Sequence, residues 1–319
     1  MSVLAKIERD RVSAEIASVD KLLARLTEDD IFMREDLEDR RAELVTILAN
    51  MADTDEIYAS AALFFGGRPV VASIGIEAQF GGDAVSKFQD LVSKLMVQEQ
   101  GLGQRGPVPN KAASTMHITN VVRGSFGFLM QEVRPQTQLV KSGLPTAVAS
   151  ANRLIAALGA PNDDEFQEVA GEVDPRALAT ASEFFGLMRS NGATFRLVVG
   201  NSDRSFTGAE IAVAVERAAE TSIEESEEQV QGTLEGTLPN AHAFEFRTLT
   251  GDVLNGRVDR ELTSELLATW NTSILGSSAV ARILVRTVKR NGVVSRQTYT
   301  LLSLAILEGP ATETVPQLR

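Results

Sequence analysis

The sequence contains no cysteine among its 319 residues. This absence excludes disulfide bonds, thiolate nucleophiles, and zinc or iron–sulfur sites with cysteine ligands. Histidine is nearly as scarce, and the two histidines are too far apart in the sequence to form a metal-ligand motif. Aromatic residues make up only 5%, so the core is expected to rest on Leu, Val, Ile and Ala.

The sequence also contains no long apolar run, and its N-terminal residues do not have the pattern expected of a signal peptide. No segment approaches the roughly 20 apolar residues that a membrane-spanning helix needs, and the N-terminus carries charges every few positions. We therefore expect a cytoplasmic protein with no membrane partner. The formal net charge of −12 argues against a general affinity for nucleic acids or anionic membranes, although a local basic patch is compatible with it.

Residues 1–52 carry the pattern of an antiparallel, coiled-coil-like helical hairpin. Apolar residues recur in narrow stripes with charged residues between them: Val12, Ile16, Val19, Leu23 and Leu26, then Leu37, Leu44, Ile47 and Met51. Each stripe buries little area by itself, so the pair needs a further partner surface. An intramolecular hairpin and a homodimer formed through these helices both remain open.

Residues 53–221 predict a central α+β domain with a mostly antiparallel sheet and packed helices. The pair Gly66-Gly67 is expected to turn one strand back into a return strand over 68–73, and a helix is expected from Asp83, a natural N-cap. Further elements are expected in this order: strands over 116–123 and 126–133, helices over 136–192, two short strands over 195–206, and a helix that begins with a Thr207–Glu210 capping box.

Residues 222–306 predict a small, partly open β-barrel of the SH3-like or OB-like kind. The signals are several short strands, one inserted helix and a long hairpin that turns at Asn291-Gly292. The acidic run at 224–228 is interpreted as a solvated face or linker, with the first strand starting near Glu227. Residues 307–319 are expected to form a flexible tail.

No catalytic, cofactor or metal motif fits its sequence context. The run from Gly101 to Gly106 matches G-x-G-x-x-G, but a helix precedes it and Pro107 and Pro109 follow it. A dinucleotide site needs the opposite order, a strand before the glycines and a helix after them. His117 is interpreted as a structural residue inside a strand. The sequence therefore predicts no catalytic residue, no cofactor and no metal.

Two groups of residues are candidate binding sites. Polar residues at the predicted turns of the central sheet would form a basic, amide-rich anion pocket if those turns met: Arg68, Arg105, Asn110, Arg123 and Ser125. Cations on the terminal hairpin form a candidate nucleic-acid surface: Arg282, Arg286, Lys289, Arg290 and Arg296. The plainer interpretations are turn chemistry for the first group and pairing with the acidic run for the second.

The leading functional hypothesis is a non-enzymatic interaction or adaptor protein that self-associates through residues 1–52. Its membership of a multi-protein bacterial system, such as antiviral defence, is a hypothesis about context. Two alternatives stay open. One is a nucleic-acid-binding protein that uses the basic hairpin, and the other is a ligand-sensing or enzymatic α+β domain with an anion site near residues 101–125.

Overall fold

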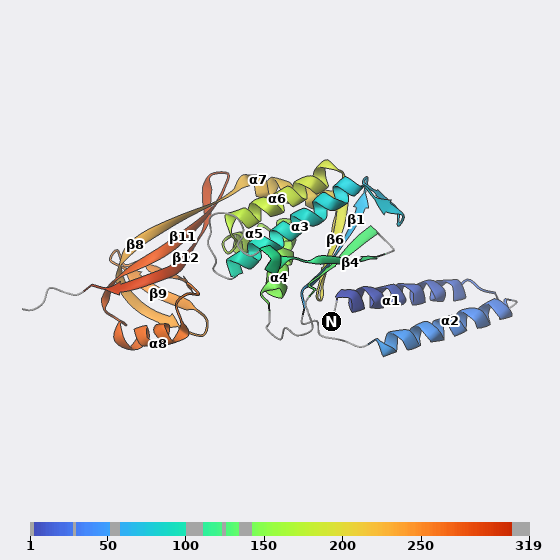
Figure 1. The fold of residues 1–319 in the computed structure, drawn as a ribbon, viewed down its shortest axis with the longest axis horizontal. Helices are drawn as coiled ribbons and strands as arrows, with labels where there is room; N and C mark the ends of the chain where they lie inside the picture. The colour runs from blue at the N-terminus through green and yellow to red at the C-terminus, as the bar shows by residue number, and fades with distance from the viewer. Residues whose placement is uncertain are drawn as a thin grey trace, which may run out of the picture.

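The computed structural model describes residues 3–27, 30–51, 58–99, 111–122, 126–133 and 142–307. The chain is an α+β protein, as the sequence predicted. Along the chain it forms a pair of helices, then a sheet covered by helices, and finally a closed ring of strands (Figure 1).

The central sheet has the strand order β4-β5-β1-β6-β7, and every neighbouring pair in it is antiparallel. The prediction of a mostly antiparallel sheet is therefore confirmed. The strands have these bounds: β1 Ser60–Gly67, β4 His117–Val122, β5 Phe126–Gln131, β6 Ala193–Val199 and β7 Ser202–Phe206. A short 3-10 helix, η1, spans Lys111–Ser114 and leads into β4.

The predicted hairpin turn at Gly66-Gly67 is wrong. Strand β1 continues through Gly67 and pairs with β5 and β6, while β2 (Val70–Val71) and β3 (Gly75–Ile76) form a separate two-stranded ribbon. Gly67 has a φ of +83°, and a Cβ there would lie 2.3 Å from the carbonyl oxygen of Gly192. The glycine therefore permits a close approach of β1 and β6 instead of a turn.

Helices cover one face of this sheet and enclose the main core (Figure 1). They are α3 (Ala78–Glu99), α4 (Leu144–Leu158), α5 (Asp163–Ala170), α6 (Pro175–Ser190) and α7 (Gly208–Glu220). The Thr207–Glu210 capping box is confirmed at the start of α7. The predicted helix start at Asp83 is wrong, because α3 begins at Ala78. The earlier start lets the ring of Phe80 pack edge-on against Phe65, with 5.5 Å between centroids.

The first half of α1 (Val3–Leu23) covers the opposite face of the sheet. Val3 and Ile7 pack there with Phe64, Leu129 and Val198. The rest of α1 extends past the sheet and lies alongside α2 (Ile31–Asn50), so the two helices project from the body (Figure 1). We call them the α1–α2 pair.

Five C-terminal strands close into a ring in the order β10-β12-β11-β8-β9, which we call the terminal ring. Their bounds are β8 Thr221–Leu238, β9 Ala243–Thr248, β10 Val253–Val258, β11 Ser278–Arg290 and β12 Val293–Ile306. The ring closes through a parallel pairing of β10 with β12. Helix α8 (Ser264–Ser273) contributes Leu267 and Trp270 to the core of the ring. The turn at Asn291-Gly292 is confirmed, with both residues at positive φ.

Residues 224–228 form a solvated face, one of the two predicted interpretations, since all of them except Glu225 are exposed. The other interpretation, a linker before the first strand, is wrong, because these residues lie inside β8. This strand begins at Thr221, immediately after α7. The run pairs with the basic strand β11 along its length, and Ile223 and Val288 in these strands pack on the main core of the central sheet. Opposite charges on the two strands explain why an acidic run adopts a paired strand. Residues 308–319 of the predicted tail lie outside the described ranges.

Candidate interaction surface

The α1–α2 pair is held together by a short apolar seam. Val12 and Val19 of α1 are buried against Leu44 of α2, and the other predicted stripe residues pack around them partly exposed, apart from Ile47 and Leu26. Two ion pairs link the helices, Arg40 with Glu15 and Arg41 with Asp20, each at 2.6 Å. The stripes predicted from the sequence therefore do form a contact between these helices.

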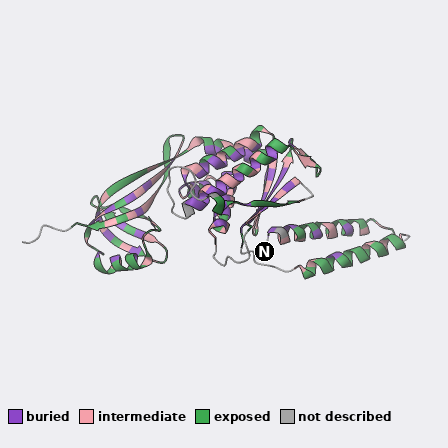
Figure 2. Ribbon diagram, in the orientation of Figure 1, coloured by how far each residue is buried: buried purple, intermediate pink, exposed green. Residues whose placement is uncertain are grey.

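Most of α2 nevertheless faces solvent. Leu44 is the one buried residue among the 20 of this helix, and Figure 2 shows α2 as almost wholly exposed. Six large apolar side chains of the pair are exposed: Leu22 (47%), Ile31 (66%), Phe32 (86%), Met33 (58%), Val45 (41%) and Ile47 (40%). Four of them lie beside the turn between the helices. Clustered exposed apolar side chains are typical of interaction sites.

The α1–α2 pair is also nearly neutral. Helix α1 carries four basic and four acidic residues, and α2 carries three basic and five acidic residues. The pair therefore holds only −2 of the net charge of −12. Charge repulsion between two copies of the chain is therefore small at these helices.

The root of the pair is fixed to the central sheet by polar contacts. Lys6 on α1 donates to the backbone carbonyl of Asn201 at 3.0 Å and lies 3.5 Å from the carboxylate of Asp203. Arg196 bridges Asp203, at 2.6 Å, and Asp10 of α1, at 3.3 Å. Hydrogen bonds from Arg196 hold the pKa of Asp203 below its ordinary value of 3.8. The direction in which the helices project is thus set by the body.

The basic hairpin is largely paired with acids. Arg286 is mostly buried, with 13% of its side chain exposed, and its Nε donates to Glu225 at 2.8 Å. Lys289 pairs with Glu224 at 2.5 Å. These two contacts are the pairing with the acidic run that the sequence allowed. The remaining predicted cations differ: Arg290 pairs with Glu220 and Asp163, whereas Arg282 and Arg296 are exposed.

A buried arginine that the sequence did not single out lies beside this network. Arg217 on α7 is 4% exposed, and its guanidinium donates to the carboxylate of Asp163 at 2.7 Å. It also donates to three carbonyl oxygens around the end of α4, those of Ala157, Leu158 and Ala160. Hydrogen bonds from Arg217 keep the pKa of Asp163 below 3.8. Asp163 therefore joins the central body to Arg290 of the terminal ring.

The predicted anion pocket is only partly within the described residues. Arg105, Asn110, Arg123 and Ser125 lie outside them. Arg68 is exposed after β1, and its guanidinium donates to the carbonyl of Ser190 at 3.3 Å. This contact supports the plainer interpretation, turn chemistry, for Arg68. His117 lies within strand β4, as predicted, and its side chain is exposed and lines a hollow beside this strand.

Three further findings bear on the chemistry. No group of three His, Asp or Glu side chains in the described ranges could hold a metal ion. None of the helices within these ranges is both long and apolar enough to cross a membrane. Comparisons with protein-family models, with curated proteins and with solved structures find no match for this chain.

Proposed function

We propose that this protein is a non-enzymatic interaction protein that self-associates through the α1–α2 pair, with a second copy of the same chain as the partner. The observation that carries the proposal is the exposure of Ile31, Phe32 and Met33 at the start of a helix that buries only Leu44. A soluble monomer gains nothing by holding three consecutive large apolar side chains in water, whereas an interface buries them.

The size of the pair suits a homodimer. Helices of 21 and 20 residues are about 30 Å long and about 10 Å wide each, so one face of the pair covers about 600 Å². Stable interfaces bury about 800 Å² of accessible surface per partner, and a helical face has more accessible surface than its flat projection. Two pairs packed face to face would form a four-helix arrangement with a closed two-fold symmetry.

Two finer structural assignments belong to the same proposal. We treat the α1–α2 pair as a coiled-coil-like antiparallel hairpin, supported by the ion pairs of Arg40 and Arg41 across the helices. We treat the terminal ring as a small SH3-like or OB-like barrel, supported by its five strands and its inserted helix α8. In this scheme, self-association presents two copies of the ring on one assembly.

Replacing Phe32 and Met33 together by glutamate is expected to convert a dimer into a monomer. Each dimer would have to bury the new carboxylates, so its dissociation constant should rise by at least roughly 100-fold. Light scattering of the full chain across a concentration series measures the change. Leu249→Glu is the matched control, because Leu249 is 76% exposed but lies on the terminal ring.

A wild-type chain that stays monomeric at 100 µM (about −5 kcal/mol of association free energy) would contradict the proposal. If the double variant dimerises as tightly as the wild type, the dimer interface does not include Phe32 and Met33, and the proposal is wrong. Deleting residues 1–52 is a poorer test, because Val3 and Ile7 cover the sheet beside Phe64 and Leu129. Such a deletion would expose the apolar face of the sheet, and this surface could cause non-native association.

Of the five predicted nucleic-acid-binding cations, only Arg282 and Arg296 are exposed on the described hairpin surface. Arg286→Glu is expected to destabilise the fold, by about 2–4 kcal/mol, because it places a second carboxylate beside the partly buried Glu225. Arg282→Glu is the control and should stay within about 0.5 kcal/mol. Urea unfolding measures both. If the two variants are equally stable, Arg286 is not needed for the fold and is available to bind a ligand. Salt-sensitive oligonucleotide binding by the wild type that is lost in both variants would then favour the nucleic-acid-binding function.

A further inference from the structure

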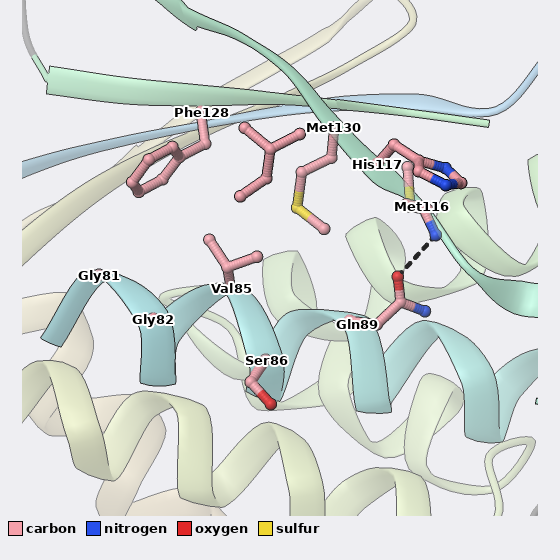
Figure 3. Close-up of a pocket in the computed structure, with 10 residues that line it drawn as sticks. Gly81, Gly82, Val85, Ser86, Gln89, Met116, His117, Phe128 and Met130 are labelled. Carbon is pink, nitrogen blue, oxygen red and sulfur yellow. Dashed lines mark hydrogen bonds between the residues drawn. The ribbon is translucent and has the colours of Figure 1, made fainter. Parts of the chain in front are cut away.

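A hollow of about 520 Å³ lies between α3 and the strands β4 and β5. Figure 3 shows Val85 from the helix and Phe128 and Met130 from the sheet side facing this space. Gln89 closes one end, where its Oε1 accepts the backbone N–H of Met116 at 2.8 Å. The lining is mostly apolar, so the hollow suits a large hydrocarbon side chain.

The helix wall of this hollow is bare at Gly82. A Cβ at Gly82 would meet no atom within 4 Å, whereas one at Gly81 would lie 3.3 Å from Ile76. Glycine in a helix costs about 1 kcal/mol relative to alanine, and at Gly82 no packing contact requires it. Its effect is to keep the hollow open on the side of α3.

A second hollow of about 380 Å³ lies farther along β4, lined by Ser73, Ile74, Val121, Val122 and Phe126. Ile118 borders the first hollow and Val121 the second. In the strand register Ile118 lies opposite Met130 and Val121 opposite Phe128, with an irregularity between them. Both partners pack towards the main core, so Ile118 and Val121 face the same side of the sheet.

Strand β4 is the edge strand beside both hollows. In the described part of the chain it pairs with β5 on one side only. Its six residues, His117–Val122, contain no charged residue and no proline, two of the features that protect an edge, and its pairing has one irregularity, between Ile118 and Asn120. Ile118 is 51% exposed, Val121 46%, and Ile74, across the second hollow, 82%. An exposed apolar edge of this kind is suited to strand addition.

We infer that the outer edge of β4 is a docking site for an extended peptide segment of a partner protein. The segment would add as a sixth strand and place a large apolar side chain in the first hollow. Its next side chain on the same face would be polar, because the exposed lining of the second hollow is mostly polar. Side chains on one face of a strand recur about every 7 Å. An extended peptide can therefore reach two separate hollows along one strand, which a single small molecule would not. Basic flanking residues are favoured, because the chain carries a net charge of −12. This inference goes beyond self-association and uses a different surface.

The test is selection of a random nonapeptide display library on the full-length protein. Enriched peptides should carry one large apolar and one polar side chain of equal strand parity, and their synthetic forms should bind at least tenfold more weakly to Val121→Lys. Gly82→Leu should weaken them similarly by filling the first hollow. This second variant favours the helix, so its effect is not an unfolding effect. Val213→Lys is the matched control, since Val213 is 41% exposed on α7.

N-methylation of alternate peptide amides should also abolish binding, because it removes strand hydrogen bonds. The inference is overturned if no sequence is enriched, if enriched peptides bind Val121→Lys and Gly82→Leu as tightly as wild type, or if N-methylation has no effect. A disulfide-linked dimer formed by Ile118→Cys would also overturn it, by assigning the edge to a second copy. The chain contains no other cysteine, so that cross-link would be unambiguous.

Discussion

Replacing Arg217 by methionine is expected to lower the free energy of unfolding by about 3–5 kcal/mol, the usual cost of removing one partner of a buried charge network. The side chain of methionine fills part of the same space but donates no hydrogen bond. The carbonyls of Ala157, Leu158 and Ala160 would each lose a donor in a buried setting. Each buried carbonyl left without a donor costs about 1–3 kcal/mol, whereas the carbonyl of Ala157 still accepts the backbone N–H of Ala160 at 3.2 Å.

The loss should spread beyond α7. Without Arg217, the carboxylate of Asp163 would lose one of its two arginine partners and would be held less firmly in place. Its remaining contact with Arg290, which joins the central body to the terminal ring, should therefore weaken. Thermal and urea unfolding followed by far-UV circular dichroism measure the effect. Arg153→Met is the matched control: Arg153 lies on α4, is 51% exposed and pairs with Glu168 and Glu172. Its loss should stay within about 0.5 kcal/mol, and equal losses for both variants would contradict the clamp role of Arg217.

Replacing Gly256 by alanine is expected to open the terminal ring, at a cost of about 3 kcal/mol, the upper end for forcing atoms into packed structure. A Cβ at Gly256 would lie 2.1 Å from the carbonyl oxygen of Tyr299 on β12. The close atom belongs to the backbone of β12, which cannot move aside as the end of a flexible side chain can. The parallel pairing of Arg257 with Thr300 and of Val258 with Leu301, which closes the ring, should separate.

Tryptophan fluorescence reports this change selectively. The chain has one tryptophan, Trp270, which is 6% exposed in the core of the terminal ring. Its emission should shift to the red at a lower urea concentration in Gly256→Ala than in wild type. Gly236→Ala is the control, because a Cβ there meets nothing within 4 Å in the same ring. Identical midpoints for the two alanine variants would show that β10 and β12 do not need the close approach.

Local signals predicted local structure well. The Asn291-Gly292 turn and the Thr207–Glu210 capping box are each specified by a few adjacent residues, and both are present. Gly66-Gly67 failed, because a glycine needed for close approach to a distant strand looks the same in sequence as a turn glycine. The start of β8 was predicted too late for a related reason: the strand that pairs with residues 224–228 lies some 60 residues away along the chain.

The candidate surfaces were predictable to a lesser degree. The spacing of Val12, Val19 and Leu44 identified the seam between α1 and α2, since helical periodicity is a local property. The exposure of Phe32 could not be read from the same pattern, because it depends on how little of α2 the body covers. Arg217 gave no signal, as a lone arginine on an amphipathic helix is normally solvated. The hollows beside β4 arise only when α3 and the edge strand are brought together.

The length of β8 has a mechanical consequence. Its 18 residues span about 60 Å at about 3.3 Å per residue. Ile223 near its start packs on the main core, and Leu234 near its end packs in the terminal ring. No tether separates α7 from this strand. The terminal ring is therefore connected to the central domain by a continuous paired strand. Any tilt of the helices that pack against Ile223 would move the terminal ring with it.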